Sequence, residues 1–242
     1  MSHSFKYSGK LFLIPSFLGE NSIYEVLPAT IAQIIAETRN FIVENDKTAR
    51  KFIKAVVPTK DQASLNLLLL NKHTDPSEIP SYLNECKNGT NIGLLSEAGC
   101  PGIADPGAEI VKIAHNEGIQ VVPLVGPSSI LLALMASGMN GQSFAFNGYL
   151  PIEKHERKQE IRLLEKLSSE KNQTQAFIET PYRNNKMMED LIQNLQTNTR
   201  LCVACDITLK SEFIATKTIG EWKKSPIDLH KRPTIFVIQK DF

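Results

Sequence analysis

A loop rich in glycine and proline, residues 96–107, follows a short apolar run at 92–95 and leads into a helix-like pattern from Ala108. A short apolar run bounded by turn residues is consistent with a buried strand. Glycines let the backbone approach a ligand closely or take a positive φ. A loop at the carboxyl end of such a strand is the usual ligand site of an α/β protein. A tight connection without a ligand is the alternative interpretation of the same residues.

Three residue pairs have the same sequence pattern at a predicted helix start: Asp105 with Pro106, Gly126 with Pro127, and Thr180 with Pro181. Each combines a residue suited to capping with a proline suited to the first helical position. A helix start presents unpaired N–H groups and a partial positive charge, which suits a ligand carrying a carboxylate and hydroxyl groups. Asp105 has two interpretations, as the cap of its own helix or as a direct ligand contact.

Apolar runs alternate with helix-like patterns through the first half of the chain. The predicted strands are 11–14, 41–43, 92–95 and 119–122, and the predicted helices are 23–35, 48–56, 75–87 and 108–118. The run 65–70 is open between strand and helix, because short apolar runs cannot be distinguished by period alone. Strand–helix alternation with short loops predicts a mostly parallel sheet flanked by helices.

The second half contains more strands and fewer helices. The predicted strands are 143–149, 176–179, 200–207, 213–219 and 234–239, and the helices are 130–135, 151–171, 184–196 and a short one around Glu221 and Trp222. Successive strands without intervening helices favour a mixed sheet. The sequence therefore predicts two α/β domains, 1–123 with a mostly parallel sheet and 124–242 with a mixed sheet, each of ordinary domain size.

Composition excludes several classes of protein. The net charge of +1 over 242 residues gives no global basic field of the kind that attracts nucleic acid. We find no apolar run approaching the roughly 18 residues of a membrane span, and no apolar signal-peptide core at the N-terminus. Four cysteines in a chain of this length do not form a disulfide framework. These features predict a cytoplasmic protein that does not enter a membrane.

Common catalytic and metal-binding signatures are absent from the sequence. It has no P-loop, no G-x-G-x-x-G and no G-x-S-x-G, and no H-E-x-x-H or paired Cys/His cluster, so no metal site is expected. Without a phosphate-binding lysine motif, a nucleoside-like ligand is favoured over a triphosphate. Cys202 and Cys205 match C-x-x-C but lie in a strand-like run, where residues three apart face opposite sides. They are therefore predicted to be buried packing residues.

One helix-like segment carries several basic side chains on mainly one face, namely Lys47, Arg50, Lys51 and Lys54. A solvated helix surface and a nucleic-acid patch are the two interpretations of this cluster. The solvated helix surface is the favoured interpretation.

Four motifs resemble those of one family. The family pattern S-D-A-G-T-P-x-I-S-D-P-G corresponds to residues 96–107, and V-V-P-x-P-G-P-S-A to 121–129. F-x-G-F-L-P corresponds to 146–151, and Y-E-S-P-H-R to 178–183. Order and spacing hold from Lys10 to Ile238. On these motifs the chain resembles the tetrapyrrole (corrin/porphyrin) methylase superfamily of S-adenosylmethionine-dependent methyltransferases, and within it a divergent member of the ribosomal RNA ribose methyltransferases.

The resemblance implies a fold and a donor site. The family has two α/β domains that bind S-adenosylmethionine in the cleft between them, often as a homodimer, with the substrate side and part of the donor site in the first domain. Carried over by position, the donor-binding residues are Ile14, Pro15, Ser96, Gly99, Cys100, Ile103, Asp105, Gly126, Pro127, Ser128, Ser129, Phe177, Ile178 and Glu179.

The implied reaction is 2′-O-methylation of a ribose in small-subunit ribosomal RNA by direct in-line displacement, with that RNA or the small subunit as partner. Departures from the family pattern fall at 15–20, 44–47 and 206–209, on the expected substrate side. A weakly acidic hydroxyl benefits from a base, and the candidates are Glu44, Asp46, Glu179 and Lys210. Two alternatives stay open: methylation of a tetrapyrrole or other small metabolite, and a non-catalytic relative that has lost activity.

Overall fold

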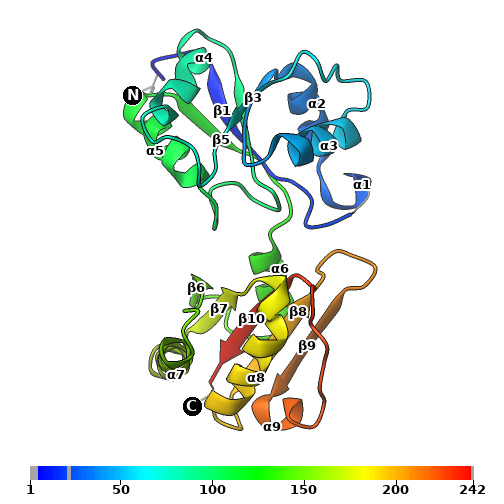
Figure 1. The fold of residues 1–242 in the computed structure, drawn as a ribbon, viewed down its shortest axis with the longest axis vertical. Coiled ribbons are helices and arrows are strands. Elements are labelled where there is room, and N and C mark those ends of the chain that lie inside the picture. The colour runs from blue at the N-terminus through cyan, green and yellow to red at the C-terminus, as the bar shows by residue number, and fades with distance from the viewer. Residues whose placement is uncertain (1–4, 21–22, 241–242) are drawn as a thin grey trace. The chain divides into compact units, whose positions relative to one another are not determined.

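The computed structural model describes residues 5–20 and 23–240. The chain divides into two compact units between Ser128 and Ser129, each with its own sheet (Figure 1). The sequence prediction placed this boundary after residue 123. None of the helices in the described ranges combines the length and the apolar character needed to span a bilayer.

The first unit is built on a parallel sheet. Its strands are β1 (Lys10–Ile14), β2 (Asn40–Val43), β3 (Asn66–Leu69), β4 (Ile92–Leu95) and β5 (Gln120–Pro123). They lie in the order β3-β2-β4-β1-β5, and every neighbouring pair is parallel. The prediction of a mostly parallel first sheet is confirmed, and the ambiguous run 65–70 contains strand β3.

Helices cover both faces of this sheet (Figure 1). They are α1 (Ile23–Val26), α2 (Ala29–Glu37), α3 (Asp46–Val56), the 3-10 helix η1 (Ile79–Leu83), α4 (Asn84–Lys87) and α5 (Gly107–Glu117). One core joins α2 and α3 to Ile14, Phe41 and Leu95. The other joins η1, α4 and α5 to Leu11 and Ile92. Alternating residues of the strands therefore serve two separate hydrophobic layers.

The predicted helix from Asp75 to Lys87 is wrong in its first half. Residues 75–78 form turns, in which the Asp75 carboxylate accepts hydrogen bonds from the backbone N–H (2.9 Å) and the hydroxyl (2.8 Å) of Ser77. Helical structure begins only at η1 and becomes α-helical at α4. Pro80 has no N–H and disfavours α conformation in the residue before it. These properties of proline account for the interruption.

The second unit is built on a mixed sheet. Its strands are β6 (Phe144–Tyr149), β7 (Thr174–Ile178), β8 (Arg200–Cys205), β9 (Phe213–Thr218) and β10 (Thr234–Gln239). They lie in the order β6-β7-β10-β8-β9. Only the β6–β7 pair is parallel, and the other three pairs are antiparallel. The predicted mixed sheet is confirmed.

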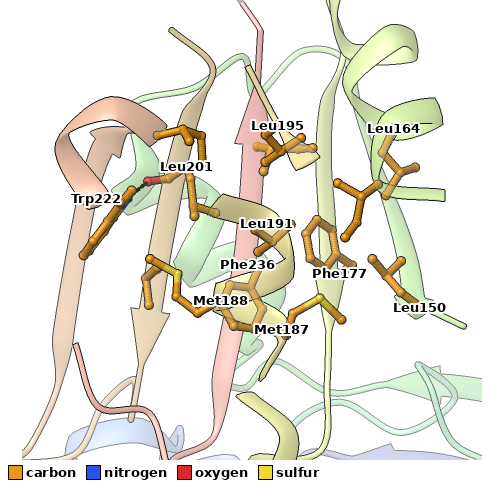
Figure 2. Close-up of a cluster of buried hydrophobic side chains, with 14 of the residues drawn as sticks. Leu150, Leu164, Phe177, Met187, Met188, Leu191, Leu195, Leu201, Trp222 and Phe236 are labelled. Atoms are coloured by element: carbon orange, nitrogen blue, oxygen red, sulfur yellow. Dashed lines mark hydrogen bonds between the residues drawn. The ribbon is translucent and has the colours of Figure 1, made fainter. Parts of the chain in front are cut away.

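The hydrophobic core of this unit lies under three of its helices. The helical segments are α6 (Ser129–Ser137), α7 (Lys154–Lys171), the 3-10 helix η2 (Pro181–Arg183), α8 (Asn184–Asn194) and α9 (Ile219–Trp222). Residues of α7, α8 and α9 pack on one face of the sheet around Phe177 and Phe236, whose rings stack at 5.8 Å (Figure 2). The indole N–H of Trp222 donates to the Leu201 carbonyl at 2.9 Å. Helix α6 contacts strands β8, β9 and β10.

Cys202 and Cys205 are both fully buried in β8, and neither forms a disulfide. Cys205 belongs to the core under α7, α8 and α9, whereas Cys202 is not part of it. Residues three apart on a strand point to opposite faces, which fits this difference. Burial raises the pKa of both thiols. The pair therefore packs the sheet and has none of the features of a reactive dithiol.

Candidate functional site

The loops at one edge of the parallel sheet hold most of the predicted site residues. Segments 15–20, 44–46 and 96–107 follow β1, β2 and β4, and these three strands are neighbours in the sheet. From β1 the chain continues to β2, on the far side of β4. From β4 it continues to β5, on the far side of β1. Where neighbouring strands send their connections in opposite directions, a crevice forms at their carboxyl ends.

Three residues of the loop 96–107 have a positive φ, and hydrogen bonds to the Asp105 side chain stabilise the loop. Gly99 and Gly102 have φ values of 74° and 82°, and Ala104 has 60°. The Asp105 carboxylate accepts hydrogen bonds from the N–H groups of Gly102 at 2.9 Å and Gly107 at 2.7 Å. Burial raises the pKa of Asp105, and these two hydrogen bonds act in the opposite direction. The N-cap of α5 is Pro106 and not Asp105, but the Asp105 carboxylate ties the loop to Gly107, the first residue of α5.

Two further predicted donor segments are bound to this loop within the first unit. The backbone N–H of Ser16 donates to the Gly99 carbonyl at 2.9 Å, and its hydroxyl donates to the Ser96 carbonyl at 3.0 Å. The Cys100 thiol donates to the Pro127 carbonyl at 3.4 Å. A Cβ on Gly126 would lie 2.2 Å from the ring of Pro15. Segments 14–16, 96–107 and 124–127 therefore form one connected surface.

Exposed apolar side chains mark two of these segments. Ile103 is 50% exposed and Val125 is 79% exposed. Single exposed apolar side chains are common on protein surfaces, so these two do not by themselves mark a ligand site. Ile103 is one of the predicted donor residues.

A cavity of about 380 Å³ opens beside the loop 96–107. Its walls come from segment 16–20, the ends of β2 and β4, residues 96–98 and one face of α3. Much of the lining is apolar, including Phe17, Leu18, Ala49 and Phe52. Phe17 and Phe52 meet edge to face with ring centroids 5.1 Å apart.

Glu44 is the predicted catalytic residue that lines this cavity. Its Oε1 atom accepts a hydrogen bond from the Glu97 backbone N–H at 3.1 Å. The Glu97 side chain in turn accepts one from the Thr48 hydroxyl at 2.5 Å. Burial raises the pKa of Glu44, and the negative charges of Asp105 and Glu97 raise it further, while the hydrogen bond from Glu97 lowers it. A carboxylate with a raised pKa is suited to accepting a proton.

Asp46 has a different role at the start of α3. It does not belong to the cavity lining described above, and it forms an ion pair with Arg50 at 2.9 Å. Lys51 pairs with Glu20 at 3.1 Å, with both side chains largely exposed. Lys47 and Lys54 are exposed on the same helix. Since two of its four cations are paired, the basic face of α3 is partly neutralised.

Of the remaining predicted residues, Ser128 is the last residue of the first unit and the others lie in the second unit. Ser129 begins α6, Phe177 is buried in the core, and Ile178 ends β7. Glu179 is buried, pairs with the Arg183 guanidinium at 2.7 Å and accepts from the Thr180 N–H. Lys210 is exposed in a turn between β8 and β9. Glu44 and Asp46 thus belong to the first unit, and Glu179 and Lys210 to the second.

Sequence reasoning missed the walls of the cavity. Thr48 and Phe52 lie one turn apart on α3, and Glu97 faces them from the loop after β4. The spacing of Thr48 and Phe52, just after the acidic strand end at Glu44, was the available signal. Within residues 5–20 and 23–240 no group of three or more His, Cys, Asp or Glu side chains could hold a metal ion.

Comparison with known proteins identifies the family. Residues 30–223 match the family model described as Tetrapyrrole (Corrin/Porphyrin) Methylases. Among solved structures, the methyltransferase CobJ superposes with a TM-score of 0.63 at 13% identity, covering 96% of this chain and 94% of CobJ. Uroporphyrin-III C-methyl transferase from Thermus thermophilus, complexed with S-adenyl homocysteine, gives 0.55 at 14% identity, covering 96% and 98%. Because the identities are only 13% and 14%, these two structures show that this chain shares their fold and show nothing further.

Several relatives carry the name ribosomal RNA small subunit methyltransferase I. That of Leptospira borgpetersenii is 33% identical over 96% of this chain and 88% of its own length. That of Buchnera aphidicola from Schizaphis graminum is 33% identical over 73% of this chain, and that of Bacillus subtilis is 37% identical over 64%. The matches span 61% of the Buchnera protein and 51% of the Bacillus protein.

A two-unit α/β fold with glycine- and proline-rich loops at the carboxyl edge of its parallel sheet is that of a class of methyltransferases. The chain belongs to the tetrapyrrole methylase family. The resemblance read from the motifs at 96–107, 121–129, 146–151 and 178–183 is thereby confirmed.

Proposed function

We propose that this protein is an S-adenosylmethionine-dependent methyltransferase that methylates a ribose 2′-hydroxyl in small-subunit ribosomal RNA. The observation that carries the proposal is the position of the Glu44 carboxylate, in a cavity beside the loop 96–107. The family match supports methyl transfer, and the names of the relatives support the RNA acceptor.

The residues of the first unit fit a nucleoside-like methyl donor. The positive φ values of Gly99 and Gly102 open the loop backbone to close approach. Ile103 and Val125 present exposed apolar surface in the neighbouring segments. When bound, S-adenosylmethionine supplies a methyl group already activated on a sulfonium. Segments 14–16, 96–105 and 124–128 of the first unit bind and orient it in this proposal.

The Glu44 carboxylate is the base in this proposal. A ribose hydroxyl is weakly acidic, so removing its proton as the new O–C bond forms assists transfer. Burial and neighbouring negative charges raise the pKa of Glu44, which strengthens it as a proton acceptor. The hydrogen bond from the Glu97 N–H holds one carboxylate oxygen in place. Orientation of donor and acceptor, with water excluded, supplies the rest of the rate gain.

Labelled methyl transfer to small-subunit ribosomal RNA tests the proposal. The RNA, or the intact small subunit, is prepared from cells lacking this protein, so that its target is unmodified. The account predicts label on a ribose, and much slower transfer by the Glu44→Gln variant. Tight donor binding without any labelling of the RNA would refute the ribosomal acceptor.

The apolar lining of the cavity favours a second candidate, methylation of a small metabolite. A polycarboxylate such as a uroporphyrin fits poorly, because Glu20, Glu44 and Glu97 all contribute to the lining. Incubation of the protein with labelled donor and a small-molecule extract separates the candidates. Label that enters a small metabolite and not RNA would favour this second function.

The ribosomal acceptor implies the partner and the location, and the family resemblance implies the assembly. Ribosomal RNA or the small subunit is the partner, and the active form is a homodimer in the cytoplasm. Light scattering coupled to size-exclusion chromatography tests the assembly. A monomer mass at working concentration would contradict the dimer.

A further inference from the structure

We propose that one edge of the second sheet binds an unpaired strand of RNA. The surface consists of Tyr149, Tyr182, His230 and Lys231, and we call it the aromatic edge. A base of the strand stacks on Tyr182, and Lys231 contacts a phosphate. The proposal rests on the proposed function, because it gives the RNA acceptor a binding surface on the second unit. That surface requires neither the methyl donor nor the proposed base.

Strand pairing brings the members of the aromatic edge together. Tyr149 ends β6, and it lies opposite Ile178 at the end of the parallel strand β7. From there the chain continues to Tyr182. Strand β10 runs antiparallel to β7, so the preceding residues 230–233 lie at the same edge. Strand β8 is antiparallel to β10 and ends at this edge as well, where the turn 206–212 follows it.

The ring of Tyr182 is exposed and has a second ring and a cation beside it. Tyr182 is 70% exposed and Tyr149 is 58% exposed. The His230 ring meets that of Tyr182 edge to face, with centroids 6.2 Å apart. The Lys231 Nζ atom lies 5.7 Å from the centroid of the Tyr182 ring. A single exposed tyrosine is ordinary, but exposed rings with cations beside them are how proteins hold the unpaired bases of a single strand.

Hydrogen bonds hold the aromatic edge in place. The Lys231 N–H donates to the Pro181 carbonyl at 3.0 Å, and Lys231 takes the left-handed conformation with a φ of 60°. The side-chain amide of buried Asn184 donates to the Arg232 carbonyl at 2.6 Å. The segment that carries His230 and Lys231 is therefore bound to the segment that carries Tyr182. A surface that is already ordered loses less entropy when a ligand binds.

Most charged side chains at this edge already have partners. The partnered groups are Arg183 with Glu179, Arg232 with Asp206, the Glu212 carboxylate with the Thr208 N–H, and the Asp228 carboxylate with the His230 N–H. Across residues 5–20 and 23–240, no ion pair engages Lys210 or Lys231. The Arg232 guanidinium also donates to the Ser211 carbonyl at 2.7 Å, which holds the turn with Lys210 at this edge. Because the acids and bases balance, stacking supplies the larger share of the affinity, and two lysines are available to phosphate.

A strand of RNA fits this surface better than a second protein chain. The centre of a protein–protein interface is depleted of charged residues, whereas charged side chains surround Tyr182. A single strand needs only a ring for a base and separate cations for its phosphates.

Fluorescence anisotropy of a labelled oligouridylate of about ten nucleotides tests the proposal with the full chain. Saturating S-adenosylhomocysteine is present, so that the strand does not occupy the donor site. Tyr182→Ala should weaken binding by about tenfold, whereas Tyr182→Phe keeps the ring and should bind like the wild type. Lys231→Gln removes one phosphate contact and should reduce the slope of log Kd against log salt concentration by about 0.7.

Two variants at the opposite edge of the same sheet are matched controls. Phe144 begins β6 opposite Thr174, the first residue of β7, and Lys171 ends α7 shortly before it. Both Phe144 and Lys171 are exposed. Phe144→Ala and Lys171→Gln should bind the strand like the wild type. Thermal melting followed by circular dichroism verifies that every variant folds.

Methyl transfer to small-subunit ribosomal RNA is the second measurement. Tyr182 is not among the predicted donor residues, so Tyr182→Ala should keep the donor affinity measured by calorimetry. It should raise the KM for the RNA more than it lowers kcat, because it removes a contact with the RNA and not with the reacting atoms.

Several outcomes would overturn the proposal. They are a wild type that does not bind the strand, equal binding by the wild type and Tyr182→Ala, and an equal loss in Phe144→Ala. A dimeric wild type with a monomeric Tyr182→Ala, seen by light scattering, would assign the edge to a second copy of the chain. If the wild type methylates ribosomal RNA in any of these cases, the inference alone fails. Strand binding that depends on Tyr182, without methylation of the RNA, would refute the proposed function and leave the inference standing.

Discussion

Replacing Gly126 by alanine should destabilise the first unit. The new Cβ would lie 2.2 Å and 2.4 Å from the Cγ and Cβ atoms of Pro15, whereas ordinary contact begins at 3.4 Å. The two segments would have to separate by about 1 Å to relieve the overlap. Pro15 is a rigid ring between buried Ile14 and Ser16, and the Ser16 N–H is bonded to Gly99. Little of this displacement can be absorbed locally.

The expected cost is that of overpacking a dense interior. Insertion of an extra methyl group into such a site destabilises a protein by about 1–3 kcal/mol. For a chain of this size each kcal/mol lowers the melting temperature by roughly 2–4 °C. Gly141→Ala is the matched control, since Gly141 is exposed, has no positive φ, and a Cβ there would meet nothing within 4 Å. Its effect should lie between zero and about 1 kcal/mol of stabilisation.

Two probes followed in one denaturant titration test this prediction. Far-ultraviolet circular dichroism reports both units, whereas fluorescence of Trp222, the one tryptophan, reports the second unit. The dichroism transition of Gly126→Ala should begin at lower denaturant than that of the wild type. A shift no larger than that of Gly141→Ala would refute the steric argument. It would also mean that the nearby ring of Pro15 does not explain why residue 126 is a glycine.

Three other substitutions test separate parts of the structure. Burial raises the pKa of Glu44 in the folded state, so its ionisation opposes folding at neutral pH. Glu44→Gln should therefore be more stable than the wild type at pH 7 and lose that advantage below the ordinary glutamate pKa of about 4.3, as measured by denaturation at both pH values. Asp105→Ala removes the acceptor for Gly102 and Gly107 and should cost about 1–2 kcal/mol by the same assay. Phe177→Ala opens a cavity in the second core, and its cost of about 3–5 kcal/mol should be visible in Trp222 fluorescence.

Much of the element order could be predicted, because it depends on local signals. Apolar runs at 11–14, 41–43 and 92–95 became parallel strands, and the glycine at 118 ended α5 in the left-handed conformation. The parallel character of the first sheet followed from strand–helix alternation. The order of its strands did not, because order depends on how helices pack across both faces of the sheet.

The interrupted segment 75–87 shows where local signals conflict. Asp75 and Pro76 look like a helix start, and the Asp75 side chain does make a capping-type hydrogen bond to Ser77. The proline at position 80 nevertheless prevents an α-helix through the middle of the segment. The segment therefore carries a helix-start signal at Asp75 and a helix-breaking signal at Pro80, and the structure follows the proline.

The candidate site was predictable only in part. The loop 96–107 follows from glycine and proline content, and Glu44 was a candidate through the family resemblance. The cavity requires α3 to lie against segment 16–20, as in the contact of Phe17 with Phe52. Residues 35 positions apart are brought together only by tertiary packing, so no local pattern specifies this wall. The donor contacts carried over from the family stay predictions.

The loops at the carboxyl edge of the first sheet are expected to bind the methyl donor. Isothermal titration calorimetry of the purified protein with S-adenosylmethionine measures this most directly. We expect saturable binding at one site per chain, weakened in Asp105→Ala, where the loop loses the hydrogen bonds from Gly102 and Gly107. The absence of binding at millimolar donor by the folded wild-type protein would contradict it, and would leave a relative that keeps the fold without the activity.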